Sequence, residues 1–509
     1  MLLSVLGNIF ASNAILMVLL GTLMGIVIGA IPGLGATIGI AVMLPFTYAM
    51  QPLSALLLLA GIFMGCGVGG SFSGILLNIP GTNESICTTI EGYPMALRGE
   101  GKKALYLASL SSTFGGIVGC VIMILFAPTL ARVALKFGPG EMAVAAIIGL
   151  TIIASLSADN MIKGILGAIF GMLIATVGID AVSGSSRFTF GNYKFTMGFK
   201  QVAIALGLIA GRQMVLEIRK AYKIGQQKLK GEYSEQKINL ENTSLLEVTK
   251  DTFGKKNLWT LIKSTIIGNV IGILPGAGSA IAAFVAYGEA KRTSKVSFGT
   301  GVDRGIIAAE SANNAAIGGT FVPMLSLGIP GSNACALVFS ALTIHGIATG
   351  PAMFTEYAEL SYGFMYGLLL SSIAMGILCI LLTPLFAKVV KVKMKYLIPP
   401  VVCCIFLGAF AVRNNMFDVM VTLAFCVIGY IFHMVSIPVA PVFLGIILEP
   451  LIEKNLVLAN TIANAKSMSL FRYIFSSKVG LIIIAIGILL LVLNIMAIRS
   501  QNKTKKGLK

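Results

Sequence analysis

Two proline-glycine pairs recur in each half of the 509-residue chain, at a spacing that could build a binding site. Pro32-Gly33 and Pro80-Gly81 lie in the first half, and Pro275-Gly276 and Pro330-Gly331 follow at nearly the same interval in the second. Each pair lies in an apolar run, where proline removes a backbone N–H and glycine permits left-handed dihedrals. Interruptions at matching places in two halves are typical of the central site of a secondary transporter.

Each break could hold an anion. A helix that restarts after a break has unpaired N–H groups and a positive dipole end, which bind carboxylate or phosphate without a cationic side chain. The opposite ends of the half-helices expose carbonyls, which suit a hard cation such as Na⁺. The candidate substrate-binding residues, which combine these backbone positions with nearby hydroxyls and amides, are Gly33, Gly35, Thr37, Gly81, Thr82, Asn83, Gly276, Gly278, Ser279, Gly331, Ser332 and Asn333.

A polar cluster lies between the two breaks of the second half. Glu310, Asn313 and Asn314 follow one another within a run of alanine and glycine. A carboxylate is costly in a membrane unless it is paired or solvated, so these residues are candidates for ion coupling, with Glu310 as the partner of a proton or Na⁺. The alternative is a buried polar cluster that only joins helices. For Glu91 we expect a solvated loop or a capping carboxylate.

Composition assigns the chain to the membrane. The mean hydropathy is +0.91, and 56% of residues are hydrophobic while 11% are charged, against about 25% charged in soluble domains. The sequence therefore predicts an all-α polytopic membrane protein with roughly twelve spans, some of them short and broken. The matching breaks predict two inverted-topology repeats with broken or re-entrant helices.

The charges divide the chain. We expect a first transmembrane repeat at 1–216, a charged cytoplasmic loop at 217–257, a second repeat at 258–499 and a basic cytoplasmic tail at 500–509. The net charge of +18 gathers in loops, as the positive-inside rule requires. No aromatic-interleaved basic stripe indicates nucleic-acid binding. Trp259, which follows Lys255 and Lys256, is expected to anchor a span at the membrane interface.

Other side chains argue against an enzyme. The eight Cys and two His show no metal-ligand or CxxC spacing, so neither a zinc site nor a disulfide framework is indicated. No nucleophile–base pair is evident, and we assign no catalytic residue and no metal ligand.

At the proline-glycine motifs and the polar cluster around Glu310, the chain resembles the TctA-like family, the large membrane subunit of the tripartite tricarboxylate transporters. The resemblance implies a bacterial inner-membrane symporter that uses a Na⁺ or H⁺ gradient and no other cofactor to import a citrate-like di- or tricarboxylate. It also implies two partners, a small TctB-like membrane subunit and an extracytoplasmic TctC-like solute-binding protein. The matching stretches are 29–45, 69–83, 91–96, 99–104, 272–290, 298–301, 310–314 and 328–351.

Two alternatives stay open. The chain could be a stand-alone or TRAP-like secondary carrier for another organic anion. A channel or a membrane enzyme has less support, because a channel needs no paired helix breaks and an enzyme needs reactive groups at membrane depth.

Overall fold

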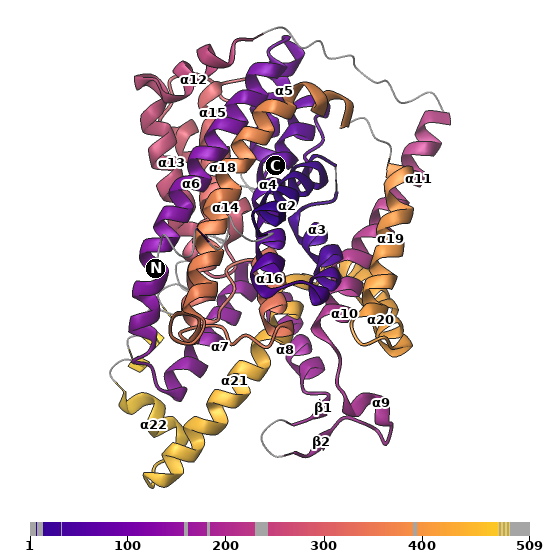
Figure 1. Cartoon of the computed structure of the whole chain (residues 1–509), viewed down its shortest axis with the longest axis vertical. Coiled ribbons are helices and arrows are strands. Elements are labelled where there is room, and N and C mark those ends of the chain that lie inside the picture. The colour runs from indigo at the N-terminus through magenta and orange to yellow at the C-terminus, as the bar shows by residue number, and fades with distance from the viewer. Residues whose placement is uncertain are drawn as a thin grey trace.

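The structure, a computed structural model, is almost entirely helical (Figure 1). It describes residues 7, 14–31, 33–156, 161–180, 184–229, 243–389, 394–477, 480–481, 484–485 and 488. Pro32, residues 230–242 of the charged loop and the basic tail at 500–509 lie outside these ranges.

The first half begins with the helices that surround its two breaks. They are α2 (Ala14–Ala30), α3 (Ala36–Met43), the 3-10 helix η1 (Leu44–Ala49), α4 (Pro52–Leu77) and α5 (Ile86–Leu97). There follow α6 (Gly101–Ala134), α7 (Pro139–Leu156), α8 (Met161–Ala175), the antiparallel strands β1 (Gly178–Ile179) and β2 (Ser186–Arg187), α9 (Tyr193–Thr196), α10 (Gln201–Ala205), the π-helical turn η2 (Leu206–Gly211) and α11 (Arg212–Leu229).

The second half has the same order of elements around its breaks. It contains α12 (Leu245–Phe253), α13 (Lys255–Ile273), α14 (Gly278–Arg292), α15 (Asp303–Leu327), α16 (Asn333–Ile344), α17 (Ala352–Thr355), α18 (Ala358–Val389), α19 (Met394–Ala411), α20 (Met416–Met434), α21 (Val439–Ala465) and α22 (Leu470–Ser476). Residues 217–229, expected in the charged loop, continue α11 as helix.

Five helices of the described part are long and apolar enough to cross a membrane. Shorter apolar helices, among them α2, α3 with η1, and α16, accompany them. The chain is therefore an all-α polytopic membrane protein, as the composition predicts, while the number of spans stays a prediction. The five candidate spans are Pro52–Leu77, Gly101–Ala134, Gln201–Lys220, Ala358–Pro384 and Met416–Met434.

The helices end where the proline-glycine pairs require. Asn78, with φ of 58°, caps the end of α4, and Gly328, with φ of 74°, caps the end of α15. Left-handed residues of this kind close a helix and satisfy its last carbonyls, and the residue before a proline is disfavoured in a helix. Gly33 and Gly276 themselves have φ of 88° and 82°, so both first breaks use the freedom that only glycine has.

Glycines set how closely the helices of each half pack. In the first half, Gly21, Gly25 and Gly29 of α2 lie against the backbone of α4 at successive turns. In the second half, Gly268 and Gly272 of α13 lie in the same way against the backbone of α15. Small residues at such spacing let membrane helices approach until their backbones touch.

The two halves interlock through antiparallel helices. The Asn314 side chain of α15 lies against Met64 of α4, whereas Glu310, one turn earlier, reaches Ser71, further along α4. α4 and α15 therefore run in opposite directions where they cross. α6 and α18 do the same, since Gly116 lies against Ser372 while Thr113 lies against Gly376.

We predict that the glycine contact between α2 and α4 limits stability. In Gly25→Leu the new Cβ would lie 2.4 Å from the carbonyl oxygen of Ile62, so the helices must separate. Overpacking costs about 1–3 kcal/mol when side chains can adjust, and backbone cannot move aside as easily. The thermal midpoint of the purified protein in detergent should fall by several degrees.

Gly288→Leu is the matched control, because a Cβ at Gly288 meets no heavy atom within 4 Å. Equal midpoints for the two variants would contradict this packing.

Candidate functional site

The two breaks of each half touch one another through their backbones. The Gly33 N–H donates to the Gly81 carbonyl at 3.4 Å, and the Gly276 N–H donates to the Gly331 carbonyl at 2.9 Å. The same positions of the two motifs thus make the same bond in both halves. Gly35 and Gly278 repeat the match, since a Cβ on them would lie 3.5 Å from Thr82 Cγ2 and 4.0 Å from Ser332 Cβ.

Four of the expected anion donors lie at helix starts. Thr37 is in the first turn of α3 and Ser279 in the first turn of α14, where N–H groups have no partner within the helix. Ser332 caps α16, with its Oγ accepting from the Cys335 N–H at 3.2 Å, and Asn333 begins that helix.

Thr82 and Asn83 lie differently from the other donors. α5 begins only at Ile86, so both residues belong to the turn that precedes the helix rather than to its first turn. Asn83 is exposed. Thr82 is buried, and its Oγ1 has no hydrogen-bond partner among the described residues. This hydroxyl is therefore a buried polar group whose hydrogen-bonding capacity is not used by the described residues.

One hydrogen bond joins the breaks of the two halves. The Ser279 Oγ, at the start of α14, donates to Glu84 Oε1 at 3.2 Å. Glu84 lies in the turn between the second break of the first half and α5. α14 also packs against α5, and α3 packs against α16, so helices that border breaks in one half contact helices that border breaks in the other. The structure thus brings the four breaks together.

Glu310 is fully buried in a cage of hydroxyls. Ser71 of α4 and Thr88 of α5 donate to its Oε1, and Ser112 of α6 donates to Oε2 at 2.7 Å. Within the described part of the chain, no Lys or Arg lies within salt-bridge distance of this carboxylate. A buried carboxylate without a cation is costly, and a proton or a small cation would relieve it.

The cage borders the first-half breaks. Ser71 follows Gly70, whose carbonyl accepts from the Gly81 N–H at 3.0 Å. Thr88 lies on the first turn of α5, directly after the segment with Thr82 and Glu84. The ion-coupling candidate and the anion-binding candidates therefore belong to one connected region.

The amides of Asn313 and Asn314 point from α15 toward α4. Asn313 Nδ2 donates to the Gly67 carbonyl at 2.8 Å, and Asn314 Nδ2 donates to the Met64 carbonyl at 3.3 Å. Both Oδ1 atoms are buried and have no donor in the part of the chain that the structure describes. Carbonyl oxygens without donors are suitable ligands for Na⁺.

The sequence did not predict several of the polar side chains in this region. Ser71, Thr88 and Ser112 carry no individual signal, because hydroxyls are common in membrane helices. Asn269 of α13 is buried with both amide atoms unpaired within the described residues. It lies between Gly268 and Gly272, which contact Ala312 and Ala316. A polar side chain in an apolar run just before Pro275 could have indicated Asn269 as a residue of the site.

Glu217 lies at the first break. Its carboxylate fills the space that a Cβ on Gly33 would need, since that Cβ would lie 2.3 Å from Glu217 Oε1. Gln213 donates to the same oxygen at 2.9 Å, and Lys220 lies 3.2 Å from it. The side chain is buried. The sequence predicted Glu217 to begin the charged loop because cations follow it. In the structure Glu217 lies within α11, and its side chain lies beside Gly33.

Glu91 is a capping carboxylate, one of the two interpretations that the sequence allowed, and it is not solvated. The side chain is fully buried. It accepts from Gly299 N at 2.6 Å, from Gly301 N at 2.9 Å, from Val302 N at 2.8 Å and from Tyr287 Oη at 2.8 Å. Glu91 of the first half therefore satisfies the free N–H groups that precede α15 of the second half.

The arrangement brings donors for an anion and acceptors for a cation into one connected region. Helix starts and hydroxyls at the breaks offer donors, whereas Glu310 and the two asparagine oxygens offer acceptors. No group of three or more His, Cys, Asp or Glu side chains in the described residues could hold a metal ion.

Comparisons with known proteins agree over nearly the whole chain. Residues 15–444 match the family described as "Tripartite tricarboxylate transporter TctA family". The chain is 32% identical over 484 residues, 94% of this chain and 93% of the relative, to an Agrobacterium vitis protein described as "Uncharacterized 52.8 kDa protein in TAR-I ttuC' 3'region". A second protein of that organism, "Uncharacterized protein in TAR-II ttuC' 3'region", is 35% identical over 191 residues, 37% of this chain and 79% of the relative. No solved structure matches.

We predict that Glu91 holds the loop before α15 in place. In Glu91→Gln the charge is lost, and an amide NH₂ faces backbone N–H groups that need acceptors. Hydrogen bonds to a charged group contribute about 1.5–3 kcal/mol net, so the free energy of unfolding should fall by about 2 kcal/mol, measured by denaturant titration in detergent.

Glu100→Gln is the control, since the Glu100 side chain is 43% exposed and its ion pair with Arg98 lies at the surface. Its loss should cost less than about 1 kcal/mol. A Glu91 variant as stable as the Glu100 variant would show that the cap contributes nothing.

Proposed function

Since this chain belongs to the TctA family of tripartite tricarboxylate transporters, we propose that it is the large permease subunit that imports a citrate-like di- or tricarboxylate across the bacterial inner membrane. Import is secondary transport, driven by a Na⁺ or H⁺ gradient in symport. The observation that carries this proposal is the meeting of the four helix breaks, paired by backbone bonds within each half and joined across the halves by Ser279 and Glu84.

The two halves, 1–216 and 258–499, form inverted-topology repeats in this proposal. The directions of the helices support this. α2 runs parallel to α4, and the corresponding helices α13 and α15 also run parallel to each other, while α4 and α15 run antiparallel. Figure 1 adds that α5 and α12, near the basic segments, lie at one end of the molecule, and that β1, β2 and α9 lie at the other. This separation fits a cytoplasmic basic end.

The substrate carboxylates bind at the breaks, on backbone N–H groups of the two first motifs. Hydroxyls of Thr37, Thr82 and Ser332 add donors, whereas the Ser279 hydroxyl already donates to Glu84 and leaves its backbone N–H for the substrate. Donors of this kind avoid the desolvation of a cationic side chain and leave room for several carboxylates. The first-motif glycines bring the backbone itself close to the substrate.

The coupled cation binds beside the substrate, on acceptors of α15. Asn313 and Asn314 supply carbonyl oxygens, and Glu310 supplies or compensates charge, either as a ligand of Na⁺ or as the group that takes the proton. Glu84 and Glu310 place negative charge next to an anion site, so the cation lowers the cost of binding the substrate. Binding of each ion thus favours the other, as symport requires.

Two partners complete the transporter: a small TctB-like membrane subunit and an extracytoplasmic TctC-like binding protein that delivers the carboxylate. Family membership supports both. The test is uptake of labelled di- and tricarboxylates into proteoliposomes, with and without the binding protein and a Na⁺ or H⁺ gradient. Uptake that needs the binding protein and a gradient supports the proposal. Full-rate, high-affinity uptake by this polypeptide alone would favour a stand-alone carrier.

We predict that transport depends on the left-handed glycines. Gly33→Val and Gly276→Val place a β-branched residue at φ of 88° and 82°, at a strain of about 1–3 kcal/mol, and uptake should fall at least about tenfold. Gly288→Val, on the exposed side of α14 where a Cβ meets nothing within 4 Å, should transport normally. If both strained variants fold and transport at the unmodified rate, the site lies elsewhere.

We also predict a split between ion and substrate effects at Asn313. Asn313→Ala removes a buried oxygen that has no partner in the described structure, and it should raise the cation concentration needed for half-maximal uptake about tenfold or more. The ranking of citrate against dicarboxylates should stay unchanged. Asn83→Ala, at an exposed amide among the candidate substrate-binding residues, is the comparison and should leave the cation requirement unchanged. An unchanged cation requirement in Asn313→Ala would remove Asn313 from the cation site.

A further inference from the structure

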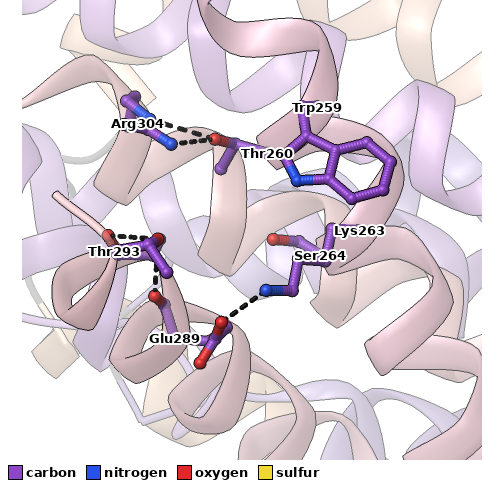
Figure 2. A pocket seen from close by; sticks show the side chains of 8 residues that line it. Trp259, Thr260, Lys263, Ser264, Glu289, Thr293 and Arg304 are labelled. Carbon is purple, nitrogen blue, oxygen red and sulfur yellow. Dashed lines mark hydrogen bonds and ion pairs between the residues drawn. The ribbon is translucent and has the colours of Figure 1, made fainter.

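A cavity lies away from the helix breaks, where α13, α14 and the start of α15 meet (Figure 2). Its volume is 210 Å³, and Trp259, Lys263, Glu289 and Arg304 are among its lining residues. A larger hollow of 510 Å³ adjoins it, shares Thr293 and Arg304, and adds Lys256 and Lys295. The two hollows form one basic pocket, defined here by these residues.

The carboxylates of the basic pocket are already neutralised. Glu289 pairs with Lys263 and also with Arg292, at 2.8 Å. Asp303 pairs with Lys103 at 2.7 Å. Lys256, Lys295 and Arg304 form no ion pair among the described residues. The pocket therefore has a surplus of positive charge.

Arg304 is held ready for an anion. Its Nε and Nη2 both donate to Thr260 Oγ1, at 3.0 and 2.9 Å, and Thr260 is buried. These bonds fix the plane of the guanidinium against α13, as Figure 2 shows, with Arg304 and Thr260 across the cavity from Glu289 and Thr293. A guanidinium that is oriented by a neutral hydroxyl keeps its charge available for phosphate.

The surroundings of the pocket favour a lipid as the source of the anion. Trp259, Ile266 and Val270 of α13 are 66%, 52% and 57% exposed, and their spacing places them with Lys263 on one face of the helix. Trp259 lies near the start of α13, directly after Lys255 and Lys256, and an aromatic residue beside cations is typical of a membrane interface. An apolar exposed face that leads into a cationic pocket at the interface matches acyl chains below a phosphate headgroup.

We propose that the basic pocket binds the phosphate headgroup of an anionic phospholipid, with Arg304 and Lys256 as its principal ligands and the acyl chains along Trp259, Ile266 and Val270. This lipid site is separate from the proposed transport site, and the proposal holds whichever substrate the transport site binds.

The test measures binding of phosphatidylglycerol and phosphatidylcholine to the purified full chain in detergent by native mass spectrometry. Phosphatidylglycerol should bind about tenfold more tightly, and Arg304→Gln and Lys256→Gln should each remove most of this preference. Arg304→Lys should retain part of it, and Lys194→Gln, on the exposed turn of α9, should retain all of it. Thermal midpoints without lipid verify that each variant is folded.

Three outcomes would overturn the proposal. Equal binding of the two lipids would show that the headgroup charge is not recognised, as expected if the small membrane subunit covers this face instead. A preference that survives in Arg304→Gln and Lys256→Gln would place the lipid elsewhere. Displacement of phosphatidylglycerol by millimolar inorganic phosphate would assign the pocket to a free anion. If Arg304→Gln unfolds, the result for Lys256→Gln decides.

Discussion

The backbone groups freed by a broken helix must find partners inside the bilayer, and this constraint governs the rest of the structure. An unpaired N–H or carbonyl in hydrocarbon costs several kcal/mol. Each half meets the requirement in part by joining its own breaks, through Gly33 with Gly81 and Gly276 with Gly331. The bonds hold only if α2 and α13 lie against α4 and α15 at backbone contact, which explains the glycines along those helices. In the proposed function, the amides at the helix starts that have no partner within the helix are the groups that bind the substrate.

A second consequence is that neither half is complete alone. The carboxylate of Glu310 comes from the second half, whereas the hydroxyls of Ser71, Thr88 and Ser112 around it come from the first. At Glu91 the roles are exchanged, because a carboxylate of the first half accepts hydrogen bonds from backbone N–H groups of the second half. A change in the angle between the halves would therefore alter the surroundings of a buried charge. Transporters that alternate access by rocking repeats use such an interface to link ion binding with movement.

The sequence predicted the backbone features of the site better than its side chains. The breaks, the polar cluster at Glu310 and the all-helical membrane fold follow from hydropathy and from the chemistry of proline and glycine, which act locally. The hydroxyl cage does not, because Ser71 and Glu310 are 239 residues apart and nothing local marks their pairing. Glu217 was assigned to a loop because the cations after it resemble a loop boundary. Thr82 and Ser332 have the same immediate neighbours in the sequence, Gly and Asn, but Ser332 caps α16 while α5 begins only at Ile86, and nothing in the motif itself indicates this difference.

A cryo-electron microscopy structure of the protein in citrate and a saturating cation, compared with one lacking citrate, would test the central claim most directly. Ligand density is expected between the Gly33–Gly35 and Gly276–Ser279 segments, within hydrogen-bond distance of their backbone N–H groups, with a cation near Asn313 and Glu310. Citrate density held elsewhere, for example in the basic pocket beside Trp259, with the four breaks empty, would contradict a transport site built from broken helices.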